Sequence, residues 1–243
     1  MPGGMIDFRA APASLPPGQR IYAVGDVHGC ADRLRTLHQA IAADLAARPA
    51  EHALLLHIGD YIDRGPDAAG VIEMLRGGSP LPGAAMINLM GNHEDILLTT
   101  LAHPRQPERA MHWLDNGGGA SLASWGLDPA DGPVAWQQRI PAPHLEFLRN
   151  LALRHEAGGY LFVHAGVRPG VPLDRQSTED LLWIREPFLS HAGDFGAVIV
   201  HGHTPIRQPA VRANRVGIDT GAVMGGRLTC AVFEGDRLGF LDA

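Results

Sequence analysis

Polar residues of metal-binding type gather in five short, glycine-containing motifs along the chain. Together the motifs supply three aspartates, one asparagine and four histidines, mostly directly after short apolar runs. Such groups bind divalent cations, and two cations about 3.5–4 Å apart lower the pKa of a shared water and hold a phosphate for in-line attack by hydroxide. We therefore expect a two-metal site that acts on phosphate. The motifs are residues 25–29, 59–65, 91–94, 164–166 and 202–204.

The motifs divide into ligands for two ions. Asp26 and His28 alternate across the first turn, so both side chains point toward one ion. Asp60 has two carboxylate oxygens, enough to bridge both ions. Oxygen and nitrogen ligands without a thiolate favour Mn²⁺, Fe or Zn²⁺ over Ca²⁺. We expect two divalent cations, with Mn²⁺ as the first choice. The predicted ligands are Asp26, His28, Asp60, Asn92, His164 and His203.

Three further motif residues are expected to act beside the metals. His93 follows a ligand, and its protonated ring is placed to give a proton to a poor leaving group such as an alkoxide. Asp63 is expected to orient His93 and to stabilise its charged form. Arg64 is expected to bind the non-bridging phosphate oxygens in the forked geometry of a guanidinium.

The pattern of apolar residues predicts how these motifs are positioned. Strands are expected at residues 21–24, 53–58 and 84–89, and amphipathic helices at 32–47, 67–76 and 92–101. Strand, turn and helix alternate three times, which predicts parallel strands joined by right-handed crossovers. The first three motifs all follow strands, at the carboxyl ends where ligands bind in such sheets.

The second half of the chain has a different pattern. Residues 104–143 are expected to be helices and loops that form the rim of the substrate cleft, so that exchanging them changes substrate preference but spares hydrolysis of a small aryl phosphate. Residues 160–163 and 197–200 are predicted strands that lead into histidine motifs. Short strands at 215–218, 228–233 and 238–241 complete the prediction of a mixed second sheet packed against the first, with helices outside. We expect a flexible leader at 1–20 and a single catalytic domain at 21–243.

Composition narrows the functional class. A net charge of −6 gives no long-range attraction to nucleic acid or to anionic lipid, and no apolar stretch approaches the ~20 residues of a membrane helix. The chain has only Cys30 and Cys230, and residues 1–20 lack the pattern of a signal peptide. We expect reduced thiols and a cytoplasmic location. The sequence carries no signal for an oligomeric state.

The motifs resemble those of the phosphoprotein phosphatase family of metallophosphoesterases, in particular its phage lambda and bacterial members. Three signatures of that family are complete here: Gly-Asp-x-His-Gly, Gly-Asp-x-x-Asp-Arg-Gly and Gly-Asn-His-Glu. Segments 112–119, 183–186, 202–205 and 218–223 extend the match from about residue 21 to residue 233. The resemblance implies an α/β calcineurin-like metallophosphoesterase fold, with two mixed β-sheets sandwiched between helical layers.

The resemblance also implies roles for individual residues. One ion is bound by Asp26, His28 and Asp60, and His93 with Asp63 forms an acid dyad. The second ion is bound by Asp60, Asn92, His164 and His203. Arg64 and Arg185 hold the phosphate, which Asn92 also contacts. In the segment His201-Gly202-His203 the family pattern selects His203 as the ligand.

Two functions follow from this resemblance. The first is dephosphorylation of phosphoserine and phosphothreonine proteins, extending to phosphotyrosine, by in-line attack of a metal-bound hydroxide with His93 as the general acid. The alternative is hydrolysis of dinucleoside polyphosphates such as diadenosine tetraphosphate. Symmetrically cleaving enzymes of that kind usually lack the equivalent of Asp63, which favours the phosphatase, although asymmetrically cleaving relatives retain it. A non-catalytic phosphate-binding module requires neither Asp63 nor His93. The expected partners are phosphoproteins or phosphorylated small molecules, and neither nucleic acid nor membrane.

Overall fold

The computed structural model describes residues 6–243, and the strands lie in two sheets. The first sheet has the order β1-β11-β10-β2-β3-β4, with β2, β3 and β4 parallel and β10 and β11 antiparallel. Its strands are β1 (Arg9–Ala10), β2 (Gln19–Val24), β3 (His52–His57), β4 (Ala85–Asn88), β10 (Thr229–Glu234) and β11 (Arg237–Asp242).

The second sheet has the order β5-β6-β7-β9-β8. Its three central strands are parallel, and both edge strands run antiparallel to their neighbours. The strands are β5 (Arg154–Ala157), β6 (Tyr160–Val163), β7 (Val198–His201), β8 (Ala210–Val211) and β9 (Arg215–Gly217).

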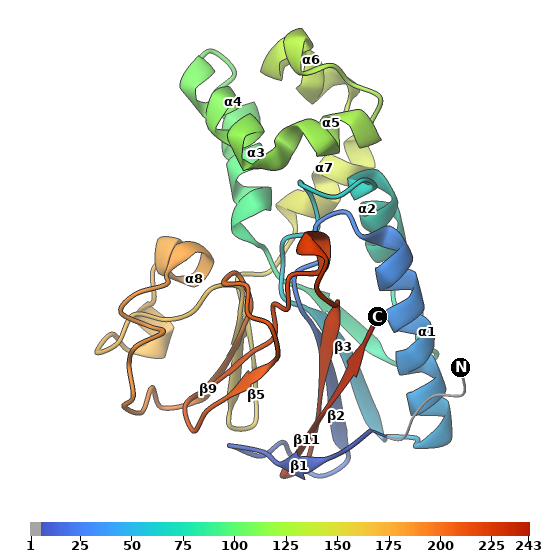
Figure 1. Cartoon of the computed structure of the whole chain (residues 1–243), viewed down its shortest axis with the longest axis vertical. Coiled ribbons are helices and arrows are strands. Elements are labelled where there is room, and N and C mark those ends of the chain that lie inside the picture. Colours follow the sequence, from blue (N-terminus) through green and yellow to red (C-terminus); the bar gives the residue numbers. More distant parts are fainter. Residues whose placement is uncertain (1–5) are drawn as a thin grey trace.

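The helices cover the outer faces of the sheets and the ends of the strands. Figure 1 shows α1 and α2 along the first sheet, α8 beyond the second sheet, and α3 to α6 above the strand ends. The helices are α1 (Ala31–Ala47), α2 (Ala68–Arg76), α3 (Asn92–Ala102), α4 (Pro107–Trp113), α5 (Gly119–Ser124), α6 (Gly132–Arg139), α7 (Ala142–Arg149) and α8 (Thr178–Trp183). Residues Leu114–Gly118 join α4 to α5 through a kink at Gly117, whose φ is 100°. None of the described helices has the length and apolar character needed to cross a bilayer.

Alternation along the strands produces the layered core. In β2, Ile21 faces a cluster shared by the two sheets, whereas Tyr22 faces α1 and α2. In β6, Phe162 faces the shared cluster and Leu161 packs toward α8. Side chains alternate between the two faces of a strand, so every central strand supplies both layers. The predicted sandwich of two mixed sheets between helices is confirmed.

Two expectations about the arrangement are wrong. The predicted strands at 228–233 and 238–241 do form, but as β10 and β11 they join the first sheet, where β10 pairs with β2. The expected leader is part of the fold from residue 9 onward, because β1 pairs with β11 and the side chain of Leu15 is buried. Residues 1–5 of that leader lie outside the described part of the chain.

The five motifs converge because each follows a parallel strand at its carboxyl end. The first three motifs follow β2, β3 and β4 of the first sheet. The fourth and fifth follow β6 and β7 of the second sheet, on the same side of the molecule. Packing the two sheets face to face therefore brings residues from position 26 to position 203 into one cluster.

Candidate metal centre

The backbone of the motif loops is held in a rare conformation. Within residues 6–243, every residue other than glycine that has a positive φ belongs to the predicted site. Left-handed backbone is uncommon for such residues and costs about 1–3 kcal/mol each. The fold therefore imposes these loop conformations against local preference. The residues are His28 (φ 43°), Asp60 (53°), Asp63 (68°), Arg64 (67°) and His203 (63°).

Two motif glycines allow the loops to touch. A Cβ atom on Gly91 would lie 2.2 Å from Oδ1 of Asp60, and one on Gly202 would lie 2.0 Å from Oδ1 of Asp26. No side chain fits at either position without displacing a predicted ligand. The glycines thus explain why the acidic residues of one motif lie directly against the backbone of another.

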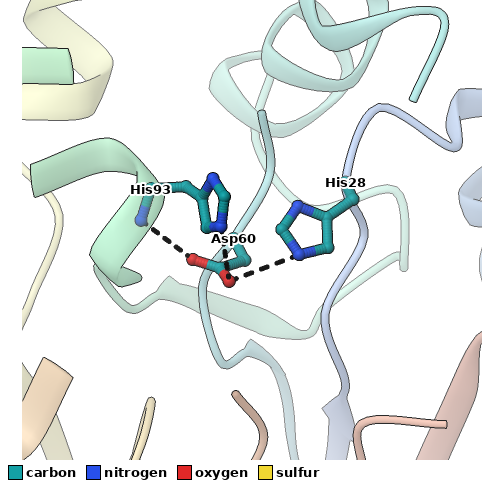
Figure 2. Close-up of side chains that lie close together, drawn as sticks. All are labelled: His28, Asp60 and His93. Atoms are coloured by element: carbon teal, nitrogen blue, oxygen red, sulfur yellow. Dashed lines mark hydrogen bonds and ion pairs between the residues drawn. The ribbon is translucent and has the colours of Figure 1, made fainter. Parts of the chain in front are cut away.

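Asp60 lies at the centre of the cluster, with its two oxygens directed to different histidines. Its Oδ2 is 3.4 Å from Nε2 of His28 and 4.0 Å from Nε2 of His93. Figure 2 shows these two rings on either side of the carboxylate, and the backbone N–H of His93 donates to Oδ1 at 3.1 Å. Oδ1 is in turn 3.4 Å from Nε2 of His164. The bridging position predicted for Asp60 matches this geometry.

A second group of ligand atoms surrounds Asn92. Its Oδ1 lies 2.9 Å from Nε2 of His164 and 2.8 Å from Nδ1 of His203. Atoms bound at about 2.0–2.2 Å to one ion stand roughly 2.8–3.5 Å apart, which is the spacing seen here. Asp60, His164 and His203 form one of two groups of close, buried ligand atoms within residues 6–243, and the other is His28, Asp60 and His93.

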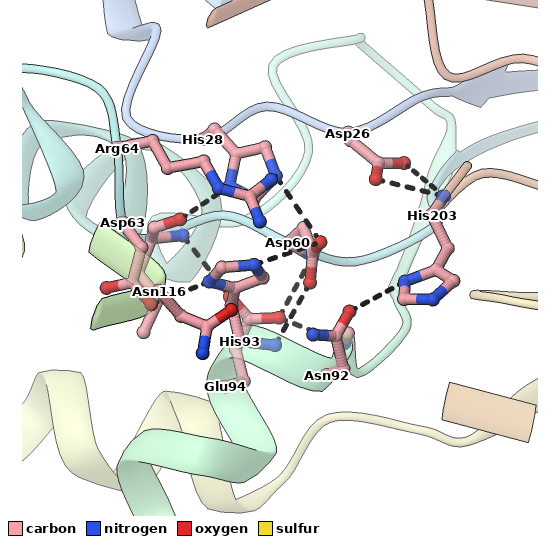
Figure 3. Close-up of polar contacts among 12 residues, drawn as sticks. Asp26, His28, Asp60, Asp63, Arg64, Asn92, His93, Glu94, Asn116 and His203 are labelled. Atoms are coloured by element: carbon pink, nitrogen blue, oxygen red, sulfur yellow. Dashed lines mark hydrogen bonds and ion pairs between the residues drawn. The ribbon is translucent and has the colours of Figure 1, made fainter. Parts of the chain in front are cut away.

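Asp26 lies beside these groups. Its carboxylate accepts a hydrogen bond from the backbone N–H of His203 at 3.0 Å (Figure 3). Burial, and then the nearby carboxylates of Asp219 and Asp60, raise the pKa of Asp26 well above its usual value. Burial raises the pKa of Asp219 itself to about 6. Several buried carboxylates without enough positive charge nearby form a strong site for cations.

The predicted histidine ligands are neutral and correctly turned for metal binding. Burial lowers the pKa of His28 to about 4 and that of His203 to about 3, and burial also lowers the pKa of His164. Nδ1 of His28 and Nδ1 of His164 each lie 2.9 Å from a backbone carbonyl, of Ile62 and Ile58 respectively. Each carbonyl fixes the tautomer and leaves Nε2 as the unprotonated nitrogen, the one that can bind a cation. The donor set therefore fits two divalent cations.

His93 and Asp63 form the expected pair. Nδ1 of His93 donates to Asp63 at 2.8 Å, which directs Nε2 toward Asp60 (Figure 3). Burial lowers the pKa of His93, but the charge of Asp60 and the hydrogen bond to Asp63 outweigh burial and raise the pKa overall. The pKa of His93 is thus shifted in the opposite direction to the pKa values of the three predicted histidine ligands.

Two residues that the sequence analysis missed hold Asp63 in place. The Trp113 indole N–H donates to its carboxylate at 3.0 and 3.1 Å. The Ser121 hydroxyl donates to Oδ1 of Asp63 at 2.7 Å and accepts from its backbone N–H at 2.7 Å. Both lie more than 45 residues from Asp63 in sequence, so no local pattern connects them. The only sequence signal for a role of Trp113 was that segment 112–119 resembles a segment of the phosphoprotein phosphatase family.

The side chain of Glu94 holds the backbone of the second motif by hydrogen bonds. Its buried carboxylate accepts from the backbone N–H groups of Asp60, Tyr61, Ile62 and Gly91 at 2.8–3.2 Å. The sequence analysis placed Glu94 in a motif but gave it no role. Its position at the start of α3 is a cue, because acidic residues in a first helical turn often satisfy free N–H groups.

The two predicted phosphate-binding arginines have different surroundings. Arg64 is exposed but lies directly against the cluster, with its Nη1 donating to Nε2 of His28 at 2.9 Å (Figure 3). Arg185 is exposed beyond the end of α8, yet its charge is close enough to help lower the pKa of His203. Arg185 thus lies at the edge of the cluster. Its role remains a prediction.

Two further expectations can be compared with the structure. The His201 ring is buried edge-on against Phe188, with the two ring centroids 4.9 Å apart, and it belongs to neither group of ligand atoms. The expected rim at 104–143 contains Trp113 and Ser121, which hold Asp63, and Gly117, whose carbonyl accepts from Arg64. These contacts argue against exchanging the segment without any effect on hydrolysis of a small aryl phosphate, which stays a prediction.

Comparisons with known proteins agree on the fold and the general chemistry. A family model described as calcineurin-like phosphoesterase matches residues 19–229. A serine/threonine-protein phosphatase 1 of Salmonella typhimurium is 31% identical, over 88% of this chain and 91% of that relative. An asymmetrical bis(5′-nucleosyl)-tetraphosphatase of Bacillus velezensis is 28% identical, over 85% of this chain and 86% of the relative.

One further relative is matched over only about half of its own length, and two solved structures show similarity of fold alone. A symmetrical bis(5′-nucleosyl)-tetraphosphatase of Aromatoleum aromaticum is 29% identical over 74% of this chain, which spans about half (51%) of that relative. A crystal structure of a provisionally named diadenosine tetraphosphatase superposes with a TM-score of 0.67 at 24% identity, covering 95% of this chain and 98% of the other. A cold-active protein tyrosine phosphatase gives a TM-score of 0.58 at 19% identity, covering 94% and 81%.

Proposed function

The chain belongs to the calcineurin-like phosphoesterase family and is a metal-dependent hydrolase of phosphoesters, and from this premise we propose that it is a serine/threonine protein phosphatase. The observation that carries the proposal is the pair His93–Asp63. The hydrogen bond of 2.8 Å between Nδ1 of His93 and the Asp63 carboxylate is buried, and the Trp113 indole N–H also donates to that carboxylate. Nε2 of His93 lies 4.0 Å from Oδ2 of Asp60, on the side of the cation site.

A proton donor is informative because substrates differ in their leaving groups. A serine or threonine alkoxide is a poor leaving group and must receive a proton as the P–O bond breaks. A nucleotide released from a phosphoanhydride leaves as a stable phosphate anion. A histidine whose pKa is raised by Asp60 and Asp63 therefore matches an alcohol leaving group.

The side chains of the site divide the work of this reaction. When bound, two divalent cations supply an acidified water and screen the charge of the phosphate. Asp60 would be a ligand of both cations, and Asn92 a ligand of the second. Arg64 is placed to bind non-bridging phosphate oxygens. His93 gives its Nε2 proton to the leaving oxygen, and Asp63 keeps the ring oriented and stabilises its charged form.

The resident cation is part of the proposal. The donor set of carboxylate, amide and imidazole without thiolate favours Mn²⁺, with Fe and Zn²⁺ as alternatives. Both sites share the Asp60 carboxylate, so the ions are expected to bind as a pair. We further propose that Asp26, His28, Asp60, Asn92, His164 and His203 are the ligands.

Dinucleoside polyphosphate hydrolysis is the second candidate. Relatives named as bis(5′-nucleosyl)-tetraphosphatases include one that matches most of its own length to this chain. The proposed metal centre and Arg64 suit dinucleoside polyphosphate hydrolysis as well as they suit dephosphorylation of a protein. It differs in requiring no proton from His93.

The test compares the Mn²⁺-loaded protein on a phosphothreonine peptide and on diadenosine tetraphosphate. We expect a higher kcat/KM for the peptide, and a loss for His93→Asn that is larger with the peptide than with the dinucleotide. A higher kcat/KM for the dinucleotide, with little effect of His93→Asn, would assign the chain to the second candidate.

A further inference from the structure

The carboxyl end of β9 carries Asp219, a buried carboxylate to which the proposed reaction gives no role. It belongs to segment 218–223, one of the segments through which the chain resembles the phosphoprotein phosphatases. The strands β6, β7 and β9 are parallel, and the fourth and fifth motifs follow the first two of them. Asp219 therefore lies at the end of a sixth parallel strand, beside the five strand ends that supply the predicted site.

Backbone contacts hold this segment against two of the motifs. The N–H of Ile218 donates to the carbonyl of His201 at 2.9 Å, directly before the fifth motif. A Cβ atom on Gly25 would lie 2.4 Å from the carbonyl oxygen of Ile218, so the first motif touches the same residue from the other side. Asp219 thus follows a backbone contact to the residue that immediately precedes Asp26.

One oxygen of the Asp219 carboxylate is free of protein partners. Its Oδ1 accepts from the backbone N–H of Gly221 at 2.9 Å, whereas Oδ2 accepts no hydrogen bond from residues 6–243. The residue is only 4% exposed. A buried carboxylate oxygen normally meets a hydrogen-bond donor or a cation, because burying it alone is costly. Oδ2 is therefore the atom of this residue that is available to a ligand.

The charge of Asp219 acts on the metal centre. Burial raises the pKa of Asp26 well above its usual value, and the carboxylate that adds most to this rise is Asp219, ahead of Asp60. These three carboxylates repel one another where little water screens them. A divalent cation among them relieves the repulsion, and each carboxylate in turn strengthens the binding of the cation.

Asp219 is better placed to support direct ligands than to be one. It belongs to neither of the two groups of close, buried ligand atoms within residues 6–243. Residues just outside the direct ligands hydrogen-bond to the groups or waters that the cation binds. Their loss typically weakens metal binding about 10–100-fold. The free Oδ2 and the repulsion with Asp26 both suit such a position.

We propose that Asp219 is a positioning residue of the first cation site. It strengthens binding of the cation held by Asp26, His28 and Asp60, through its charge and by accepting through Oδ2 from a water of that cation. The inference rests on the metal centre of the proposed function and adds a carboxylate from a sixth strand. Asp219 acts through the cation and takes no part in proton transfer.

The test variant removes the charge and keeps the turn. Asp219→Asn retains a side-chain oxygen that accepts from the N–H of Gly221. Asp194→Asn is the matched control, because Oδ1 of Asp194 accepts from the N–H of Gly196 at 2.8 Å in the same kind of turn. Asp194 is exposed and precedes the amino end of β7, the end opposite to the motif.

Binding of Mn²⁺ to the metal-free protein, measured by calorimetry, is the main readout. We expect two cations to bind the wild-type protein, and Asp219→Asn to weaken one of the two dissociation constants about 10–100-fold. Asp194→Asn should leave both constants unchanged. Asp219→Glu, which keeps the charge, should bind Mn²⁺ more tightly than Asp219→Asn. Unchanged constants for Asp219→Asn, or equally weak binding by the glutamate variant, would overturn the proposal.

Urea unfolding of the metal-free protein distinguishes this role from support of the fold. Removing a like charge beside Asp26 should move the unfolding midpoint of Asp219→Asn to higher urea, while Mn²⁺ binding becomes weaker. A purely structural residue does not give effects of opposite sign. A lower midpoint together with weaker Mn²⁺ binding would show that Asp219 supports the fold, and the proposal would be wrong.

These measurements need no substrate, so they separate the inference from the proposed function. Wild-type protein that binds two Mn²⁺ ions but does not hydrolyse a phosphothreonine peptide would contradict the protein phosphatase, and a weakened constant for Asp219→Asn would still support the inference. Wild-type protein that binds no Mn²⁺ would contradict the metal centre and the role of Asp219 together.

Discussion

Neighbouring histidines in the site have opposite protonation behaviour for a structural reason. His28, His164 and His203 lose their protons because they are buried. His93 is buried as well, but the charge of Asp60 and the hydrogen bond from its Nδ1 to Asp63 outweigh burial, and its pKa rises. His93 differs from His28 and His164 in having a second carboxylate, Asp63, in addition to the nearby Asp60.

Replacing His93 tests the proton donor directly. His93→Asn should lower kcat by about 10²–10⁴-fold for a phosphothreonine peptide, because the alkoxide then leaves without a proton. The loss should be much smaller for p-nitrophenyl phosphate, whose phenolate is a good leaving group. Manganese content should be measured alongside. Equal losses on both substrates at full metal content would contradict a general-acid role.

The segment from α4 to α5 contacts the His93–Asp63 pair directly, through side chains that donate hydrogen bonds to Asp63. The Trp113 indole and the Ser121 hydroxyl both donate to Asp63, one from each side of the kink at Gly117. The position of α4 and α5 therefore helps to set the orientation of His93 through Asp63.

Removing one hydrogen bond should reveal this connection. Trp113→Phe keeps an aromatic ring in the core but deletes the N–H that donates to Asp63. We expect kcat for the phosphothreonine peptide to fall about 10-fold, and less for p-nitrophenyl phosphate. Trp136→Phe is the matched control, since that buried indole donates to the Asp128 carbonyl and not to Asp63. The same change in substrate ratio for both variants would indicate a general loosening of the core.

Elements fixed by neighbouring residues were predictable, and long-range partners were not. The helix at 32–47 and the strand at 21–24 follow from apolar spacing and reappear as α1 and β2. The contacts of Trp113 and Ser121 with Asp63 depend on how α4 and α5 fold back, which no local pattern records. In the same way, a strand pattern at 228–233 predicts a strand but not the sheet that it joins.

At the scale of the whole molecule, buried histidines outside the site affect acid stability. His38 of α1 and His57 of β3 contact each other through Nε2 at 2.9 Å, and Nδ1 of His57 lies 2.8 Å from Oδ1 of Asn88. Burial lowers the pKa of His38 to about 4. Burial and the neighbouring His38 also lower the pKa of His57 well below its usual value. Both rings are therefore neutral in the folded protein.

Acid should destabilise the fold through this pair. An unfolded histidine takes up a proton near pH 6.5, whereas folded His38 does so only near pH 4, so the unfolded state binds more protons between those values. Stability should fall as pH drops from 7 to 5, by about 1–2 kcal/mol for His38. Urea unfolding in the presence of a chelator should show a shallower pH dependence for His38→Gln. The exposed His52→Gln is the control, and an equal slope for all three proteins would contradict the assignment.

The position of β10 also sets an order of events during biosynthesis. Val24 of β2 pairs with Cys230, and 230 − 24 leaves 206 residues to be translated between them. At about 5–20 residues per second, that edge of β2 waits roughly 10–40 s for its neighbour on the ribosome. His203, too, emerges long after Asp60. The nascent chain thus carries an open strand edge and half of a cation site until late in translation, the period in which a chaperone would protect it most.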